Sequence, residues 1–186
     1  GHSLETVRQA VDEKLAQAVA ESRTGRAELL AAFAAFETQL AQRLAEPPDH
    51  ERQLEAARRW MKEWHFRIGV HHLRGLIDAF EAGKHYADLA EAVILALWPV
   101  VVAAFEAKHG AAPGRGAVLL GMGSLGAGRL NAGSDLDLIM IYDAAGVEGS
   151  TGLRPLGART DYARLTQAMV TAMSAQMAEG RLYEVD

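Results

Sequence analysis

The 186-residue chain contains no cysteine. Without thiols it can form neither a disulfide framework nor a thiolate zinc site, and no cysteine can act as a nucleophile. A chain without disulfides is compatible with a reducing compartment, and its first residues show no signal-peptide pattern. We therefore expect a cytoplasmic protein.

Long hydrophobic runs and a strong positive charge are missing as well. The longest apolar run covers residues 92–105, which is shorter than the roughly 20 residues that a membrane-spanning helix needs. The formal net charge is −5 at pH 7, which argues against a large nucleic-acid-binding surface. Hydrophobic residues nevertheless make up 49% of the chain, enough for a sizeable core. We expect no membrane and no nucleic acid among the partners.

The first part of the chain has helical periodicity. Apolar residues recur every three or four positions in four segments, residues 4–22, 25–46, 51–81 and 85–109. The prolines of "EPPDH" (residues 46–50) separate the second segment from the third, because proline lacks an amide donor and clashes with the preceding turn. Gly69 and Gly75 are candidate division points in the third segment, and Pro99 is a candidate kink in the fourth. The pattern predicts a helical bundle over residues 4–110.

The pattern changes at "GAAPGRG" (residues 110–116), which has the composition of a linker. The sequence after it predicts strands over residues 117–123, 135–143 and 181–185, and a helix over residues 161–180 with Gly180 as its C-cap. We therefore expect an α+β fold, in which the helical bundle precedes a second domain with a small mixed sheet over residues 111–186.

Several conspicuous side chains have structural interpretations. His71 and His72 are adjacent, so they point about 100° apart on a helix, and with His65 they do not make a zinc spacing. We assign these histidines to surface or packing roles. Tryptophans and methionines at helical spacing are predicted core residues: Trp60, Trp64, Trp98, Met169, Met173 and Met177.

The stretch "GMGSLGAGRLNAGSDLDLIMIYD" (residues 121–143) contains the candidate site. Gly123 and Ser124 follow the first predicted strand. Glycine removes the side chain that would keep an anion from the backbone amides, and a helix N-terminus favours negative charge. Taken alone, these residues also fit a tight turn with no ligand.

Two aspartates stand one residue apart ten residues later. Asp135 and Asp137 would share one face of a strand, where two carboxylates repel each other unless something compensates them. Magnesium prefers oxygen ligands and keeps phosphate oxygens in its shell. An inert solvated pair is the alternative, but the upstream glycine turn favours a metal–phosphate site. Asp186 is the best third carboxylate, able to bind a cation and to take a proton from an attacking hydroxyl, although any terminal aspartate would give the same signal.

The order Gly-Ser, Asp-x-Asp and a later Asp on a neighbouring strand resembles the nucleotidyltransferase superfamily of the polymerase-beta type. More closely, residues 120–143 together with "AEGRLYEVD" (residues 178–186) look like the glutamine synthetase adenylyltransferase family. Upstream, "RRWMKEWHFRIGVHHLRG" and "LAEAVILALW" resemble the helices that precede the catalytic core in that family. The resemblance covers roughly residues 30–186.

The resemblance implies a polymerase-beta-type nucleotidyltransferase core and an adenylyltransferase reaction. A tyrosine hydroxyl of glutamine synthetase would attack the α-phosphorus of ATP, and pyrophosphate would leave. Asp135, Asp137 and Asp186 match the ligands of Mg²⁺, and Gly123 and Ser124 match the turn that holds the triphosphate. Arg129 is a further candidate for a phosphate contact, and a solvated position is its alternative.

The family's full-length enzyme carries two such halves, one adding AMP and one removing it by phosphorolysis. "LYEVD" is more like the adding half, and the removing half stays an alternative. In this family a small nitrogen-signalling protein commonly regulates activity, so it is an expected partner. The family chain also continues past the third aspartate, so we interpret this chain as a fragment.

The sequence departs from the family pattern at two places. Lysine commonly stands where this chain has Ser124, and Arg-Glu-Leu where it has Gly128, Arg129 and Leu130. These departures fall at the positions expected to contact the nucleotide, and they keep a second class open, a non-catalytic module that binds nucleotide or docks a partner. A nucleotidyltransferase acting on a small molecule is less favoured, because the helical domain stands in front of the core.

Overall fold

A computed structural model of the chain describes residues 27, 31, 35–47 and 49–186. The mixture of helices with a small sheet confirms the α+β class, whereas the predicted helix over residues 4–22 lies outside the described residues. The elements are α2 (Phe36–Ala45), α3 (His50–Leu73), α4 (Ala79–His109), β1 (Gly116–Gly121), α5 (Gly123–Gly126), β2 (Leu138–Asp143) and α6 (Ala158–Ser174).

Aspartates cap the starts of the two long helices. The Asp49 carboxylate accepts a hydrogen bond from the Arg52 amide at 2.9 Å at the start of α3. At the start of α4, Asp78 accepts from the Glu81 amide at 2.8 Å, and the Glu81 carboxylate accepts from the Asp78 amide at 3.1 Å. Such reciprocal capping satisfies amides that have no partner inside the helix.

The predicted division at Gly69 is wrong, because α3 continues through it to Leu73. A side chain at this position would approach the Tyr86 hydroxyl at 3.3 Å, so glycine here admits a close contact between α3 and α4. The break occurs at Gly75, whose φ of +69° is in the left-handed region that glycine adopts freely. Helix α4 continues through Pro99.

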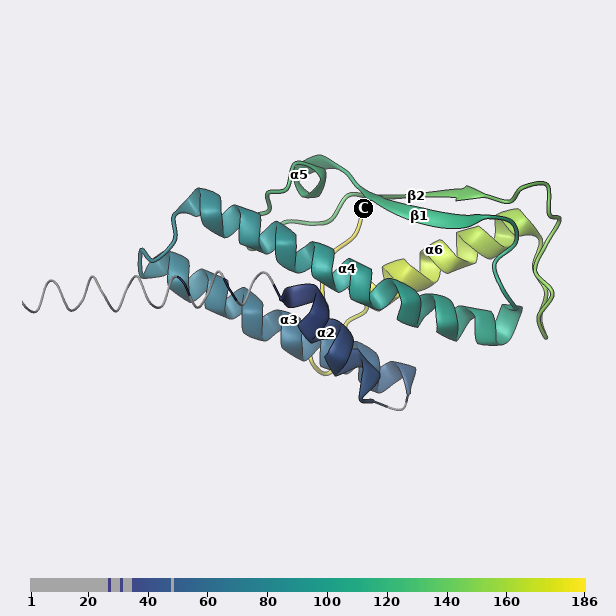
Figure 1. The fold of residues 1–186 in the computed structure, drawn as a ribbon, viewed down its shortest axis with the longest axis horizontal. Coiled ribbons are helices and arrows are strands. Elements are labelled where there is room, and N and C mark those ends of the chain that lie inside the picture. The colour runs from purple at the N-terminus through teal and green to yellow at the C-terminus, as the bar shows by residue number, and fades with distance from the viewer. Residues whose placement is uncertain (1–26, 28–30, 32–34, 48) are drawn as a thin grey trace, which may run out of the picture.

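Helix α4 is the centre of the fold. It contacts α2, α3 and α6 and crosses the molecule beneath the sheet (Figure 1). By length and composition it could cross a membrane, but these contacts make it a core helix. The buried core draws on both predicted parts of the chain, from Trp60 and Trp64 in α3 to Met169 and Met173 in α6, as the sequence predicted. Trp98 and Met177 are only partly buried.

The sheet is smaller than the sequence predicted. Strands β1 and β2 pair antiparallel, in a register that runs from Gly116 opposite Asp143 to Gly121 opposite Leu138. Strand β2 begins at Leu138, three residues later than predicted. In place of the predicted third strand there is a single parallel bridge between Leu136 and Val185, so the sheet is mixed only at this bridge.

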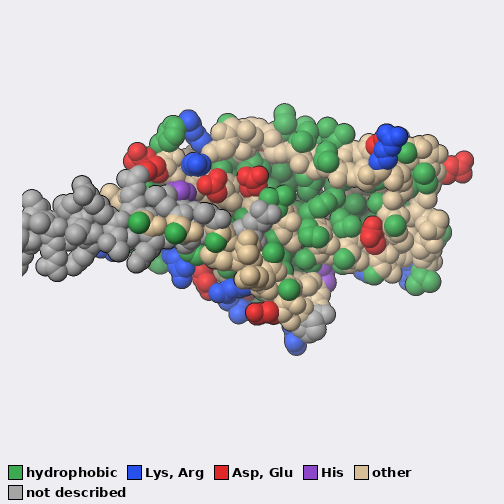
Figure 2. All heavy atoms as spheres, in the orientation of Figure 1, with side chains coloured by type: hydrophobic (Ala, Val, Ile, Leu, Met, Phe, Trp, Pro, Cys, Tyr) green, Lys and Arg blue, Asp and Glu red, His purple; other side chains and the backbone are tan. Residues whose placement is uncertain are grey.

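The two faces of the sheet differ as the alternation of residues 135–143 predicts. On the inner face, Leu138 and Met140 pack against the core, and the Tyr142 ring stacks on Tyr162 of α6 at 4.2 Å. On the outer face, Ile139 and Ile141 are 47% and 52% exposed. Figure 2 shows apolar side chains on the surface along the sheet edge of the molecule.

Helix α6 ends at Ser174, so the predicted end at Gly180 is wrong. A guanidinium from α3 closes the helix: Arg58 Nη2 donates to the carbonyls of Ala172 at 3.1 Å and Ala175 at 3.5 Å. Arg58 is only 1% exposed. A cation at a helix C-terminus satisfies carbonyls without intrahelical partners and interacts favourably with the helix dipole. Residues 175–180 can therefore leave the helix axis.

A buried carboxylate lies at the other end of α6. Asp161 is fully buried, and neither of its oxygens accepts a hydrogen bond from a described residue. The nearby Ser150 hydroxyl donates instead to the Leu156 carbonyl at 3.5 Å. Burial raises the pKa of Asp161, while the proximity of Ser150 and His109 opposes that rise and Glu106 adds to it. Folding therefore favours the protonated form of Asp161.

We expect Arg58→Met to lower the free energy of unfolding by about 2–3 kcal/mol, because it leaves the Ala172 and Ala175 carbonyls without their charged donor. The adjacent Arg59 is the matched control, since its side chain is 59% exposed and pairs only with Glu179 at the surface. Arg59→Met should change the free energy of unfolding by less than about 0.5 kcal/mol. Urea unfolding measures both variants, and equal effects would contradict the capping role.

Asp161→Asn should make the chain more stable than wild type at about pH 7, because the folded state no longer holds a buried carboxylate. Asp161 has a folded-state pKa above its ordinary value of 3.8, so the wild type loses stability as the pH rises from that value through the raised pKa. The difference between the two proteins should vanish below about pH 3.5, where the carboxyl is protonated in both states. Urea unfolding across this range tests the sign. The exposed Glu148, changed to Gln, is the control, with an expected effect at pH 7 below about 0.5 kcal/mol.

Candidate functional site

The turn at Gly123 is paired through backbone hydrogen bonds with the segment that carries Asp137. Strand β1 ends at Gly121, opposite Leu138, and the next amide, that of Met122, donates to the Asp137 carbonyl at 2.8 Å. The one-turn helix α5 then begins at Gly123. The β1–β2 register therefore brings together two segments that are about ten residues apart in the sequence.

Gly123 and Asp137 are in direct contact. A Cβ atom at position 123 would overlap Asp137 Oδ2 and lie 3.1 Å from Asp137 Cγ. The φ of Gly123 is +52°, in the left-handed region that disfavours residues with a side chain. The backbone conformation thus favours glycine at this position, and a side chain here would also displace the Asp137 carboxylate.

The backbone of Asp186 lies beside Asp137. The Asp186 amide donates to the Leu136 carbonyl, and the Asp186 carbonyl accepts from the Leu138 amide, both at 3.0 Å. These two bonds flank Asp137 in a parallel arrangement, and residues paired in this way project to the same face of a sheet. The segment of residues 181–186 therefore lies on the side of β2 opposite to β1 and the turn.

Asp135 precedes this pair on the same face, since the fully buried Leu136 between them points inward. Asp135, Asp137 and Asp186 are all exposed. Among the described residues, no group of three His, Asp or Glu side chains stands close enough to hold a metal ion. The backbone places the three carboxylates along one edge, and side-chain rotation is needed for them to converge on a cation. Their donor atoms are all oxygens, the ligands that Mg²⁺ prefers.

Ser124 and Arg129 lie on the turn side of the site. Ser124 is exposed in the single turn of α5, and its carbonyl accepts from the Arg129 amide at 3.0 Å. The Arg129 guanidinium stacks on the Phe80 ring, 3.7 Å from its centroid, at the start of α4. The phosphate-binding roles of both residues remain predictions.

A cavity of about 320 Å³ opens next to Asp135, and we call it the Asp135 cavity. Its walls come from α3, from the loop before Asp135 and from residues 181–184, with Lys62 and His65 supplied by α3. His65 Nε2 lies 2.8 Å from the Ala132 carbonyl and so ties that loop to α3. Sequence reasoning missed these residues because no local motif links residues 62–65 to the aspartates.

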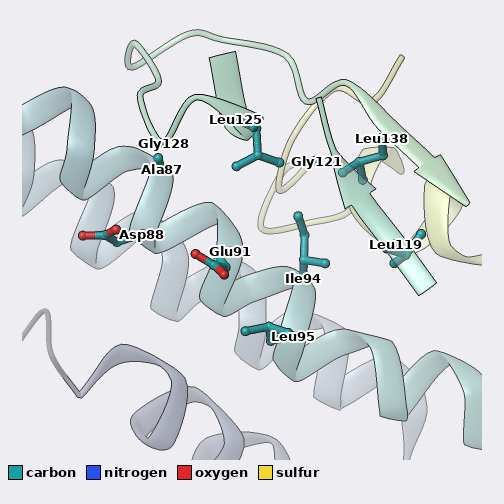
Figure 3. A pocket seen from close by; sticks show the side chains of 11 residues that line it. Ala87, Asp88, Glu91, Ile94, Leu95, Leu119, Gly121, Leu125, Gly128 and Leu138 are labelled. Carbon is teal, nitrogen blue, oxygen red and sulfur yellow. The ribbon is translucent and has the colours of Figure 1, made fainter. Parts of the chain in front are cut away.

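A second cavity, of about 340 Å³, lies between α4 and the turn. Figure 3 shows Asp88 and Glu91 projecting from α4, with Leu125 of the turn and Leu138 of β2 across from them. Gly121 and Gly128 also line this cavity. None of the predicted site residues lines it.

The chain is similar to one known protein family over most of its length. The family model described as "Glutamate-ammonia ligase adenylyltransferase" matches residues 5–186. A relative from Mesorhizobium japonicum, named "Bifunctional glutamine synthetase adenylyltransferase/adenylyl-removing enzyme", is 46% identical over 138 residues, which are 74% of this chain and 14% of the relative.

Two further relatives carry the same printed name. The one from Xanthobacter autotrophicus is 45% identical over 138 residues, covering 73% of this chain and 14% of the relative. The one from Brucella suis is 41% identical over 152 residues, covering 81% of this chain and 16% of the relative. The chain therefore spans about a seventh of the length of these relatives.

We expect Gly123→Ala to destabilise the chain by more than Gly128→Ala. Both glycines have positive φ, +52° and +68°, but a Cβ at position 128 meets nothing within 4 Å. Gly128→Ala should therefore cost only the backbone term of about 1–2 kcal/mol, and Gly123→Ala should cost about 1 kcal/mol more because it displaces the Asp137 carboxylate.

A double-mutant cycle isolates the contact between the two residues. In an Asp137→Ala background the nearest atom to a Cβ at position 123 is Cβ of residue 137, at an ordinary 3.7 Å. The extra cost of Gly123→Ala should then disappear, and its effect should match that of Gly128→Ala. Urea unfolding of the variants measures these free energies. An unchanged cost of Gly123→Ala in the Asp137→Ala background would show that the Asp137 carboxylate does not contribute to that cost.

Proposed function

The chain belongs to the glutamate-ammonia ligase adenylyltransferase family, and from this we propose that it carries a polymerase-beta-type nucleotidyltransferase site that moves AMP from ATP to a tyrosine hydroxyl of glutamine synthetase. The observation that carries the proposal is the alignment of Gly123, Asp137 and Asp186 across three adjacent segments. A backbone turn suited to an anion and carboxylates suited to a cation lie side by side there.

In the proposed site, Asp135, Asp137 and Asp186 would hold Mg²⁺. A bound cation would neutralise charge on the triphosphate and compensate the repulsion between the carboxylates. Gly123 and Ser124 hold the β- and γ-phosphates, since glycine leaves the turn amides open to the phosphate oxygens. Arg129 contributes a further phosphate contact once its guanidinium leaves Phe80.

The proposed reaction requires little covalent chemistry from the residues of the chain. The tyrosine oxygen attacks the α-phosphorus, a new P–O bond forms, and the bond to the pyrophosphate oxygen breaks. Asp186 accepts the proton of the tyrosine hydroxyl. The chain contributes mainly by positioning the reactants, which a site built on paired backbone segments does well.

The relatives are named for both adding and removing AMP. We assign this chain to the adding half because of the sequence "LYEVD" (residues 182–186). We also propose that it works in the cytoplasm and that a small nitrogen-signalling protein regulates it.

A non-catalytic nucleotide-binding or partner-docking module is the second candidate. Two observations favour it: the three aspartate side chains do not converge, and Arg129 is engaged by Phe80. Mg²⁺-dependent ATP binding without AMP transfer to glutamine synthetase would identify this function. Transfer of AMP from labelled ATP would exclude it.

Asp137→Asn should reduce Mg²⁺-dependent AMP transfer to glutamine synthetase by at least about 100-fold, because the amide is a poor ligand for a hard cation. The melting temperature should stay close to that of wild type, since this side chain is exposed. The assay follows the label of α-labelled ATP into glutamine synthetase.

Asp143→Asn is the control at the other end of β2. Its Oδ2 pairs with the exposed Arg115, and its Oδ1 accepts from the Ala145 amide at 2.8 Å, a bond that asparagine can retain. The control should transfer AMP at the wild-type rate. Unchanged transfer by Asp137→Asn would refute the metal site.

A further inference from the structure

The proposed site has two distinguishable sides. The turn at Gly123 lies on the β1 side of Asp137, and residues 181–186 lie on the other side of β2. In a phosphoryl-type transfer the attacking and leaving oxygens stand roughly in line across the phosphorus. If the turn holds the leaving pyrophosphate, as the proposed function requires, the acceptor hydroxyl has to arrive from the side of residues 181–186.

The Asp135 cavity opens on that side. It is lined by Asp135 itself and by residues 181–184, the segment that leads into Asp186. At about 320 Å³ it lies at the lower end of the roughly 300–1,000 Å³ typical of ligand pockets. Its lining includes the apolar residues Met61 and Leu182, the ring of Tyr183, and the small residues 132–134 of the loop before Asp135.

The charged residues that line the cavity indicate which charge a ligand should carry. Arg181 and Glu184 on its wall form an ion pair with each other. Asp135 faces the proposed cation, so its charge is compensated there. Lys62 remains, an exposed residue that lines the cavity and forms no ion pair with any other described residue. A carboxylate on the arriving segment would complement it.

We propose that the Asp135 cavity receives the acceptor tyrosine of glutamine synthetase together with an acidic residue next to it. The ring lies against Met61, Leu182 and Tyr183, and Lys62 pairs with the neighbouring carboxylate. Lys62 is then a specificity-determining residue for the protein substrate, and His65 a positioning residue that holds the loop of residues 132–134. This inference rests on the proposed function for its direction of attack.

Lys62→Glu tests the charge. We expect the KM for glutamine synthetase to rise about tenfold, because a like charge then faces the acidic segment, while the KM for ATP and kcat stay within about twofold of wild type. Lys108→Glu is the matched control, a charge reversal on an exposed lysine in the last turn of α4, away from the Asp135 cavity. It should leave all three constants unchanged. An unchanged KM for glutamine synthetase in Lys62→Glu, or an equal rise in both variants, would overturn the proposal.

A crosslinking experiment does not depend on catalysis. A photoreactive benzoylphenylalanine at position 62 should label the glutamine synthetase peptide that contains the acceptor tyrosine, and the same group at position 108 should not. Absence of this label, or equal labelling from both positions, would refute the docking site. If the wild-type chain transfers no AMP but position 62 labels that peptide, the proposed function fails while the docking surface stands.

Discussion

The arrangement of the candidate site depends on one buried cation, Arg58, at the C-terminal end of α6. Arg58 is on α3, in the first half of the chain, and it donates to the last carbonyls of α6, 114 residues later. Burial lowers the pKa of this guanidinium, and the nearby Glu55 opposes that effect. A desolvated charge is costly unless it is hydrogen-bonded. The end of α6 supplies acceptors for Nη2, whereas Nε and Nη1 are buried without a hydrogen-bond partner among the described residues.

The position at which α6 ends determines where the third carboxylate stands. Beyond Ala175 the chain turns back, with the Met177 and Gly180 backbones paired. The Met173 carbonyl then accepts from the amides of both Leu182 and Tyr183, at 3.0 and 3.1 Å. This anchoring directs residues 184–186 along residues 136–138. A shift in the end of α6 would therefore move Asp186 relative to Asp137, although Arg58 does not contact either aspartate.

The sequence predicted the features that depend on a local pattern of apolar residues. Helical periodicity predicted α3, α4 and α6, and the alternation of residues 135–143 predicted which face of β2 is buried. It failed where tertiary contacts matter. Gly69 lies inside α3 at a close approach to Tyr86, and α6 ends before Gly180 at carbonyls that Arg58 binds. Asp135 and Asp137 were candidates from their spacing, whereas Asp186 became one mainly through the resemblance to the family. Their neighbours Lys62 and His65 were not, because a helix more than 60 residues upstream supplies them.

The carboxylates on this edge are not neutralised by the basic residues of the neighbouring segments. Those residues have other partners: Arg181 pairs with Glu184, and Arg129 stacks on Phe80. Within the described part of the chain, no basic side chain forms an ion pair with Asp135, Asp137 or Asp186. Backbone pairing nevertheless fixes Asp137 next to Asp186, so their repulsion cannot be relieved by separating the segments without breaking hydrogen bonds. In the function proposed above, a divalent cation shared with a triphosphate would compensate this repulsion beside the turn at Gly123.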